Sequence, residues 1–336
     1  MSVLITVNHA ILHILDFNSG ITVFSEQELD ITSNSVVTFL AKHIEKSFTD
    51  HNAKAGTFHP DSNFKQQLAE YMDGRADFTG FSVYIADVIY TAISQSEAAD
   101  STDLIICDCE IDSKRVIALL KCNNKIGFIH QVTHQDEKIR NEIINHYAIL
   151  PGLTQKLDEY ALIEADSLAI RFIDKKRSIN GEESYILADR ILECSSLISA
   201  KETIKLVSSI TRMVAENHGQ SSVEAVSKTK KFIVENTEIS EYLDPVELGK
   251  EVFRSSPLMQ AEYINEVKSA GIPETVKLDR TLALQKGKNH KIKTDTGIEI
   301  TFPADYFQNK EFIEFINNAD GTLSIALKNI GSITNK

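Results

Sequence analysis

Cysteine and proline are scarce in this sequence, and tryptophan is absent. Four cysteines (Cys107, Cys109, Cys122 and Cys194) and six prolines occur among 336 residues. The cysteines show neither the paired CxxC spacing of a zinc site nor the regular framework of a small secreted domain. We therefore expect reduced, buried cysteines, as in a cytoplasmic protein.

Long apolar runs are also missing. No stretch reaches the roughly 18 to 20 apolar residues that a membrane-spanning helix needs. The opening stretch "SVLITVNHAILHIL" has no basic segment and no small-residue cleavage site, so we do not expect a signal peptide. With 42% hydrophobic and 25% charged residues, the composition is that of a globular protein, and we expect no membrane partner.

The common catalytic motifs are absent as well. The sequence contains no GxxxxGK[ST], GxGxxG, HExxH or GxSxG. The missing glycine-rich loops argue against nucleotide hydrolysis, because a phosphate cradle needs closely presented backbone amides. We expect a protein that is not an enzyme, with no catalytic residues and no cofactor.

Two groups of polar residues could hold a metal ion. The first is His130 and His134 in "HQVTHQDE", followed by Asp136 and Glu137. Two histidines at this spacing share a face if the segment is helical. Val132 and the preceding "IGFI" favour a strand running into a loop instead, so we expect no metal site here.

The second group could support a metal-dependent nuclease, which needs two or three carboxylates and a lysine around one cation. Its members are Asp103, Asp108, Glu110, Asp112 and Lys114. On a strand, Asp108 and Glu110 share a face with Leu104 and Ile106, which favours an exposed edge or a solvated face. The nuclease hypothesis therefore stays the least favoured one.

The order of patterns predicts an α+β fold. Paired β-rich runs, two or three helices and further paired strands fill residues 1–185, which we expect to form a mixed sheet with helices. Residues 186–275 have a helical pattern and predict a module of about four helices, which could mediate self-association. Residues 276–336 predict a small β-rich unit, with turns at Asp295 to Gly297 and at Asp320-Gly321.

The helical module carries clear start and stop signals. Ser199 with Glu202, and Ser221 with Glu224, have the spacing of capping boxes. Asp244-Pro245 and Ser256-Pro257 place a capping residue before a proline at the first helical position. Gly219 and Gly271 stand where C-terminal caps belong.

The formal net charge of -13 predicts repulsion from nucleic acid, so any contact with DNA must be local. Cations gather in residues 277–293, against a single acid, Asp279. They are Lys277, Arg280, Lys286, Lys288, Lys291 and Lys293. A second group, Lys228, Lys230 and Lys231, is predicted to lie on a solvated helix face balanced by Glu224 and Glu235.

Residues 277–293, the basic segment below, read as a connection that leads into a hairpin. Lys291 and Lys293 alternate with Ile292, so both project from one face of a strand. Such lysines either protect a strand edge from pairing or bind an anion. The segment has no aromatic residue, so nucleic acid bound there should be double-stranded and contacted at its backbone.

The chain resembles the bacterial 37-kDa nucleoid-associated protein family. The resemblance lies in "FHPDSNFKQQLAEYMDGRADFTGFSVYIADVIYTAI", the paired "DLIICDCEI" and "KRVIALLKCNNKIGF", and the C-terminal "GIEITFPADYF" with "EFINNADGTLSIAL". It implies a cytoplasmic protein of the nucleoid that binds double-stranded DNA and contacts enzymes of DNA topology. It assigns no functional residues.

Two main hypotheses follow from the sequence. In the first, the protein is a non-enzymatic binder of double-stranded DNA. The DNA-binding residues are then expected from charge alone to be Arg280, Lys286, Lys288, Lys291 and Lys293. In the second, the chain is a protein interaction module that acts on a DNA-processing enzyme such as a topoisomerase, because an acidic surface can meet a basic partner.

Overall fold

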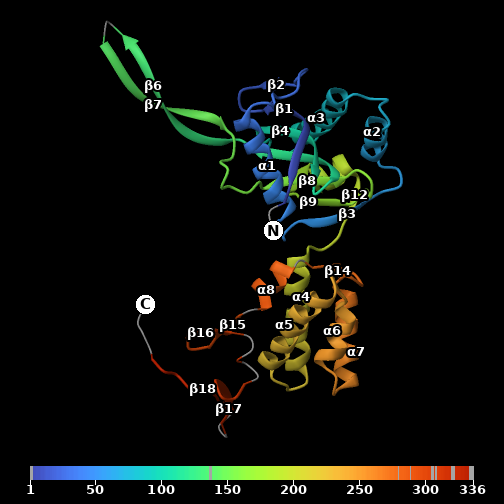
Figure 1. The fold of residues 1–336 in the computed structure, drawn as a ribbon, viewed down its shortest axis with the longest axis vertical. Helices are drawn as coiled ribbons and strands as arrows, with labels where there is room; N and C mark the ends of the chain where they lie inside the picture. The colour runs from blue at the N-terminus through green and yellow to red at the C-terminus, as the bar shows by residue number, and fades with distance from the viewer. Residues whose placement is uncertain are drawn as a thin grey trace. The chain divides into compact units, whose positions relative to one another are not determined.

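A computed structural model of the chain describes residues 3–135, 138–278, 280–287, 289–303, 306, 309–318 and 322–332. The chain divides into two compact units, Met1–Leu197 and Ile198–Lys336. The units are shown in Figure 1. Sheet and helices together confirm the predicted α+β class.

The first unit is built on one antiparallel sheet, in which the described residues form eight strands in the order β12-β3-β9-β8-β5-β4-β1-β2. These strands are β1 (Ile5–Asp16), β2 (Ile21–Val23), β3 (Lys54–Phe58), β4 (Thr102–Ile111), β5 (Lys114–Asn123), β8 (Glu159–Glu164), β9 (Ile170–Ile173) and β12 (Cys194–Ser196). The antiparallel pairs β1–β2, β4–β5 and β8–β9 confirm the paired strands expected within residues 1–185.

Helices cover both faces of this sheet. They are α1 (Asn34–Phe48), α2 (Asn63–Met72), α3 (Phe78–Ser94) and the π-helix η1 (Ile186–Leu192). In β4, Leu104 and Ile106 pack in the core formed with α2, α3 and η1. The alternate residues Ile105 and Cys107 pack in the core formed with α1. A strand buried on both faces has a nearly continuous apolar sequence, as β4 does.

Strand β4 corrects one sequence expectation. It lies between β1 and β5 and pairs with both, so it is not an exposed edge. Asp108, expected on a solvated face, is 1% exposed. Its burial requires partners that the sequence does not reveal. All four cysteines are buried and free, as predicted.

The core of the first unit includes residues of η1 and β12. Helix η1 contributes Ile186, Leu187 and Ile191 to the same core as α2 and α3, and Cys194 on β12 joins it. The compact unit therefore includes residues up to Leu197. The division into three domains stays a prediction.

Two hairpins of the first unit form sheets of their own. One consists of β10 (Lys176–Ile179) and β11 (Glu182–Tyr185). The other consists of β6 (Lys125–Gln135) and β7 (Lys138–Ile149), which we call the β6–β7 arm. Figure 1 shows the arm extending away from the eight-stranded sheet as a twisted ribbon.

The second unit begins with four helices, α4 (Ala200–Asn217), α5 (Ser222–Ile239), α6 (Pro245–Val252) and α7 (Pro257–Ser269). Each predicted start is confirmed. The side chains of Ser199, Ser221, Asp244 and Ser256 cap α4, α5, α6 and α7 by accepting hydrogen bonds from backbone N–H groups. Gly219 and Gly271 both have φ of 64°, which confirms them as C-terminal caps.

The rest of the second unit mixes a helix with short strands. Its elements are β13 (Tyr242–Leu243), β14 (Val276–Lys277), α8 (Arg280–Gly287), β15 (Asn289–Lys293), β16 (Glu299–Pro303), β17 (Ile313–Asn317) and β18 (Leu323–Leu327). The two predicted hairpins are β15–β16 and β17–β18. The turn predicted at Asp320-Gly321 lies outside the described residues.

Helix α8 differs from the expected connection. The sequence predicts a basic linker here, but Arg280–Gly287 forms a helix. Its apolar residues explain the difference: Leu282 and Ala283 are buried with Leu278 in the core of the second unit. Burying these apolar side chains removes them from water, which favours a packed helix over an open linker.

A candidate nucleic-acid interface

The structure places four of the five predicted DNA-binding residues on two neighbouring elements, α8 and β15. Arg280 begins α8, and Lys291 and Lys293 lie on β15. Lys286 lies on α8, but its side chain is outside the described part of the structure, as is the whole of Lys288. Arg280, Lys291 and Lys293 are all exposed.

Strand β15 orients its two lysines as the sequence predicts. Lys291 and Lys293 alternate with Ile292, which is half-buried and pairs across the hairpin with Ile300. Lys291 is opposite Thr301, and Lys293 is opposite Glu299. Directly opposed residues share one face of the hairpin, so both lysines and Glu299 lie on the same face.

The basic segment gains carboxylate neighbours that the sequence does not show. Lys277 Nζ lies 3.4 Å from Glu241, and Arg280 Nη2 lies 3.9 Å from Glu238. Lys291 Nζ lies 2.6 Å from Glu299, a residue of β16. These partners are contributed by the end of α5, the loop after it and the facing strand.

The ion pairs of this segment are exposed. Arg280 and Glu238 are 68% and 63% exposed, and Lys291 and Glu299 are 62% and 46% exposed. Such pairs contribute little to stability because water and salt screen them. The cations can therefore exchange a carboxylate for another anion at small cost.

Helix α5 brings the second basic group, Lys228, Lys230 and Lys231, close to the basic segment. Lys228 pairs with Glu224, and Lys231 with Glu235, as predicted. Lys230 Nζ donates a hydrogen bond to the backbone oxygen of Asn289 at 3.2 Å, so it lies at the start of β15. The two basic groups are far apart in the sequence, and no sequence signal shows that they lie close together.

Close packing of α8 on α5 brings the second basic group and the basic segment together. A Cβ atom added to Gly287 would lie 2.2 Å from Val234 Cγ2 and 3.3 Å from the backbone oxygen of Lys230. Glycine therefore allows the end of α8 to approach α5 more closely than any other residue could. The first residue of α8, Arg280, reaches Glu238 further along α5.

The candidate nuclease residues do not form a catalytic cluster. Both carboxylate oxygens of Asp108 accept hydrogen bonds from Arg115, and Tyr71 Oη donates to Asp108 Oδ2 at 2.6 Å. Glu110 is exposed, and Lys114 pairs with Glu164 at 2.9 Å. The buried carboxylate is thus already neutralised by a guanidinium.

The described residues of the candidate metal site, His130 and His134, join no larger group of metal-ligating side chains. His130 and His134 are exposed on β6, which continues as a strand where the sequence suggested a loop. Asp136 and Glu137 lie outside the described residues. Among the residues that the structure describes, no group of three or more metal-ligating side chains comes together.

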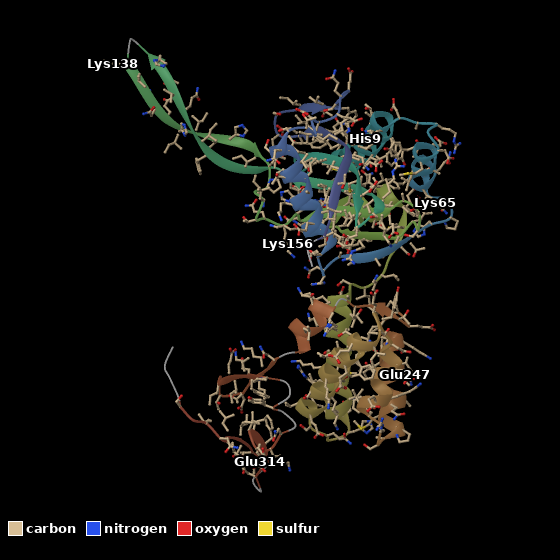
Figure 2. All side chains as sticks on the ribbon, viewed as in Figure 1. His9, Lys65, Lys138, Lys156, Glu247 and Glu314 are labelled. Carbon is tan, nitrogen blue, oxygen red and sulfur yellow. The ribbon has the colours of Figure 1, made fainter. Side chains whose placement is uncertain are left out.

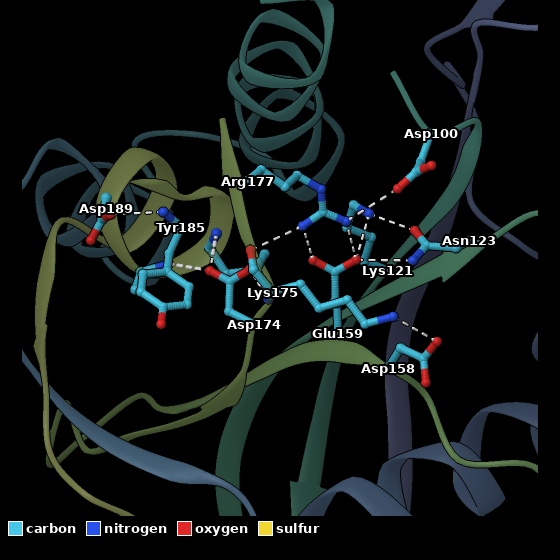
Figure 3. A network of polar contacts seen from close by, with 12 residues as sticks. Asp100, Lys121, Asn123, Asp158, Glu159, Asp174, Lys175, Arg177, Tyr185 and Asp189 are labelled. Carbon is cyan, nitrogen blue, oxygen red and sulfur yellow. Dashed lines mark hydrogen bonds and ion pairs between the residues drawn. The ribbon is translucent and has the colours of Figure 1, made fainter. Parts of the chain in front are cut away.

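A buried ionic network that the sequence does not predict lies at one end of the large sheet (Figure 3). Glu159 on β8 accepts hydrogen bonds from Lys121 Nζ at 2.8 Å, Arg177 Nη2 at 2.6 Å and Asn123 Nδ2 at 2.9 Å. The side chains of Glu159 and Lys121 are 0% exposed. Arg177 also lies 3.5 Å from Asp100, which is half exposed.

Two carboxyl groups near this network have displaced pKa values. Burial alone would raise the pKa of Glu159, but the hydrogen bonds from Arg177 and the charge of Lys121 hold it well below its usual range. Burial raises the pKa of Asp174 to about 7, although backbone N–H groups of Ala188 and Leu187 donate to it. The role of this satisfied network is structural, because it joins β5, β8 and β10.

Side chains cover the surfaces of both units (Figure 2). None of the described helices is both long and apolar enough to cross a membrane. Among the described residues, the protein has an α+β fold with exposed cations beside α5 and α8.

Comparison with known protein families identifies the family to which the chain belongs. A family model described as nucleoid-associated protein YejK matches residues 11–334, which is nearly the whole chain. The chain therefore belongs to this family of nucleoid-associated proteins, and the resemblance seen in the sequence is confirmed. A search among curated proteins found no match.

Proposed function

We propose that this nucleoid-associated protein is a non-enzymatic binder of double-stranded DNA that acts through its basic segment. The observation that carries the proposal is that a chain of a nucleoid-associated family has exposed cations on an otherwise acidic molecule. The family is nucleoid-associated, and Arg280, Lys291 and Lys293 are exposed on adjacent elements of a chain whose net charge is -13.

Binding through this segment would use phosphate contacts. Lysine and arginine side chains bind the DNA backbone whatever the base sequence, and each contact releases counterions. The carboxylates beside Arg280 and Lys291 then act as competitors: a phosphate must displace Glu238 or Glu299. This competition favours weak binding that depends strongly on salt. The proposed place of binding is the nucleoid.

The test compares duplex binding by the native protein with binding by a fivefold variant. The variant carries Arg280→Gln, Lys286→Gln, Lys288→Gln, Lys291→Gln and Lys293→Gln. We expect weaker binding at low salt and a shallower dependence of log K on log salt. The slope should fall by roughly 0.9 for each phosphate that the variant no longer neutralises.

A matched control removes the same formal charge elsewhere. It carries Lys42→Gln, Arg75→Gln, Lys175→Gln, Lys176→Gln and Lys250→Gln, all at residues whose side chains are about half exposed or more. Its salt slope should equal that of the native protein. An equal weakening of binding in both variants would show that overall charge, rather than the basic segment, governs binding.

The second candidate function is contact with a DNA-processing enzyme, such as one that controls DNA topology. It is favoured by the carboxylates that lie beside the basic segment, because Glu238, Glu241 and Glu299 offer a mixed-charge surface suited to a protein partner. An interaction that survives nuclease treatment, together with no duplex binding at low salt, would select this function.

A further inference from the structure

The β6–β7 arm is amphipathic in an unusual way. Its register places Phe128 opposite Asn145, His130 opposite Ile143, Val132 opposite Asn141 and His134 opposite Ile139. Directly opposed residues of a hairpin share a face. One face of the arm therefore carries these eight residues, four of them apolar and none of them lysine, arginine or a carboxylate.

The described charges of the paired strands lie on the other face. Arg140 is opposite Thr133, Glu142 is opposite Gln131, and Lys138 is opposite Gln135. Arg140 and Glu142 also form an ion pair at 3.1 Å. The charged face is suited to water, and the uncharged face is suited to a partner.

The apolar side chains of the uncharged face are exposed. Phe128 is 74% exposed, Val132 52%, Ile139 68% and Ile143 79%. With roughly 150 to 200 Å² for each fully exposed side chain of this size, they present on the order of 500 Å² of contiguous surface. That is at the upper end of the largest apolar patch on an ordinary monomer.

A two-stranded ribbon is marginally stable by itself in water. In the described part of the chain, β6 and β7 pair with each other and with no other strand. Covering the uncharged face would stabilise the ribbon. If the same face of a second ribbon covered it, the two faces together would bury about 1,000 Å², which is the size at which specific interfaces begin.

The charge of the β6–β7 arm indicates which partner covers its uncharged face. Residues 125–149 contain Lys125, Lys138 and Arg140 against Asp136, Glu137 and Glu142, so their formal charges cancel. The whole net charge of -13 therefore belongs to the remainder of the chain. Double-stranded DNA needs cations that this face lacks. A second copy of the arm meets no such mismatch, because two neutral arms can join while the acidic remainders stay apart.

We propose that the uncharged face of the β6–β7 arm binds the same face of a second copy of this chain. The contact has twofold symmetry, in which each residue pair occurs twice. An antiparallel arrangement places Phe128, near the base of one arm, toward Ile139, near the tip of the other. Val132 and Asn141 then lie near the twofold axis. This inference does not depend on the proposed function.

The first test is the oligomeric state of the full chain, measured by sedimentation over a range of concentrations. We expect a dimer of twice the 37.5 kDa chain mass. Phe128→Asn with Ile143→Thr should weaken dimerisation at least tenfold. The matched control, Gln131→Ser with Thr133→Ser on the charged face, should dimerise like the native protein. A monomeric native protein, or equal dimerisation of both variants, would overturn the proposal.

A cross-linking test guards against loss of the fold in the apolar variant. Val132→Cys, near the expected axis, should form a disulfide-linked dimer on mild oxidation, while Gln131→Cys on the charged face should not. The native cysteines are buried and should stay inert. Equal cross-linking of both variants, or none at position 132, would contradict the proposed face. So would a monomeric protein whose duplex affinity falls with the Phe128 and Ile143 substitutions, since DNA would then be the occupant.

Discussion

The two units of this protein achieve stability by different means. The first buries both faces of a central sheet and encloses a charged network around Glu159. The second has one core beneath helices with well-formed caps, and its charged side chains near the basic segment are exposed. The first unit therefore holds a buried ionic network, whereas the ion pairs of the basic segment in the second unit are exposed to water.

The largest effect should come from Glu159→Gln. This change leaves Lys121 and Arg177 without their buried carboxylate, which should cost about 3–5 kcal/mol in the free energy of unfolding. Urea denaturation followed by circular dichroism measures the loss. Glu183→Gln removes the exposed partner of Lys176 and should change little. Similar losses in both variants would remove the distinction between buried and exposed charge.

The next effect concerns the packing of α8 on α5. Gly287→Ala brings a Cβ atom against Val234 Cγ2, so we expect a destabilisation of about 1–3 kcal/mol. Val234→Ala makes room, and the double variant should lose less than the sum of the single losses. Strict additivity in the denaturation midpoints would show that the two residues do not meet.

The pH dependence of the first unit should change with Asp174→Asn. The pKa of Asp174 is raised from 3.8 to about 7 in the folded protein, so between these values the folded state holds a proton that the unfolded state releases. Asp174 therefore lowers the free energy of unfolding as pH rises from about 4 to about 7. Asparagine keeps a hydrogen-bond acceptor and does not titrate.

Urea midpoints across this pH range measure the effect. The Asn variant should lose less stability than the native protein as pH rises. Asp158→Asn changes an exposed carboxyl group and should retain the native slope. An Asp174 variant with the native slope would show that this group does not titrate between the two values.

The smallest effect tests the helix caps of the second unit. Ser199→Ala removes the acceptor for Glu202 N–H and should cost about 1 kcal/mol. Ser208→Ala, in the interior of the same helix, removes a hydroxyl that donates to the Ile204 carbonyl and should not destabilise. Thermal unfolding of the two variants side by side would separate capping from a general serine effect.

Local features of the fold could be predicted because they depend on neighbours in the sequence. Ser199, Ser221 and the proline-linked caps indicated the helix starts. The paired runs "DLIICDCEI" and "KRVIALLKCNNKIGF" are joined by a tight turn at Asp112 and Ser113, both with positive φ. Three features could not be predicted: the burial of Asp108, the network around Glu159 and the contact of Lys230 with Asn289. Each joins residues from different elements, and the sequence does not give their distance.

The candidate site was predicted in part, for the same reason. Alternation of Lys291 with Ile292 correctly gave the shared face of the β15 lysines. Helix α8 was not predicted, because cations dominate the segment and only the burial of Leu282 and Ala283 in the core favours a helix there. The carboxylates beside Lys277 and Arg280 come from another part of the unit, so the sequence of the segment alone could not show them.

The salt dependence of duplex binding tests the claim that the basic segment contacts DNA. We expect the native protein to bind double-stranded DNA with a steep salt slope. Neutralising Arg280, Lys286, Lys288, Lys291 and Lys293 should make the slope shallower, while the matched control should leave it unchanged. An identical slope for the native protein and the fivefold variant would contradict the claim.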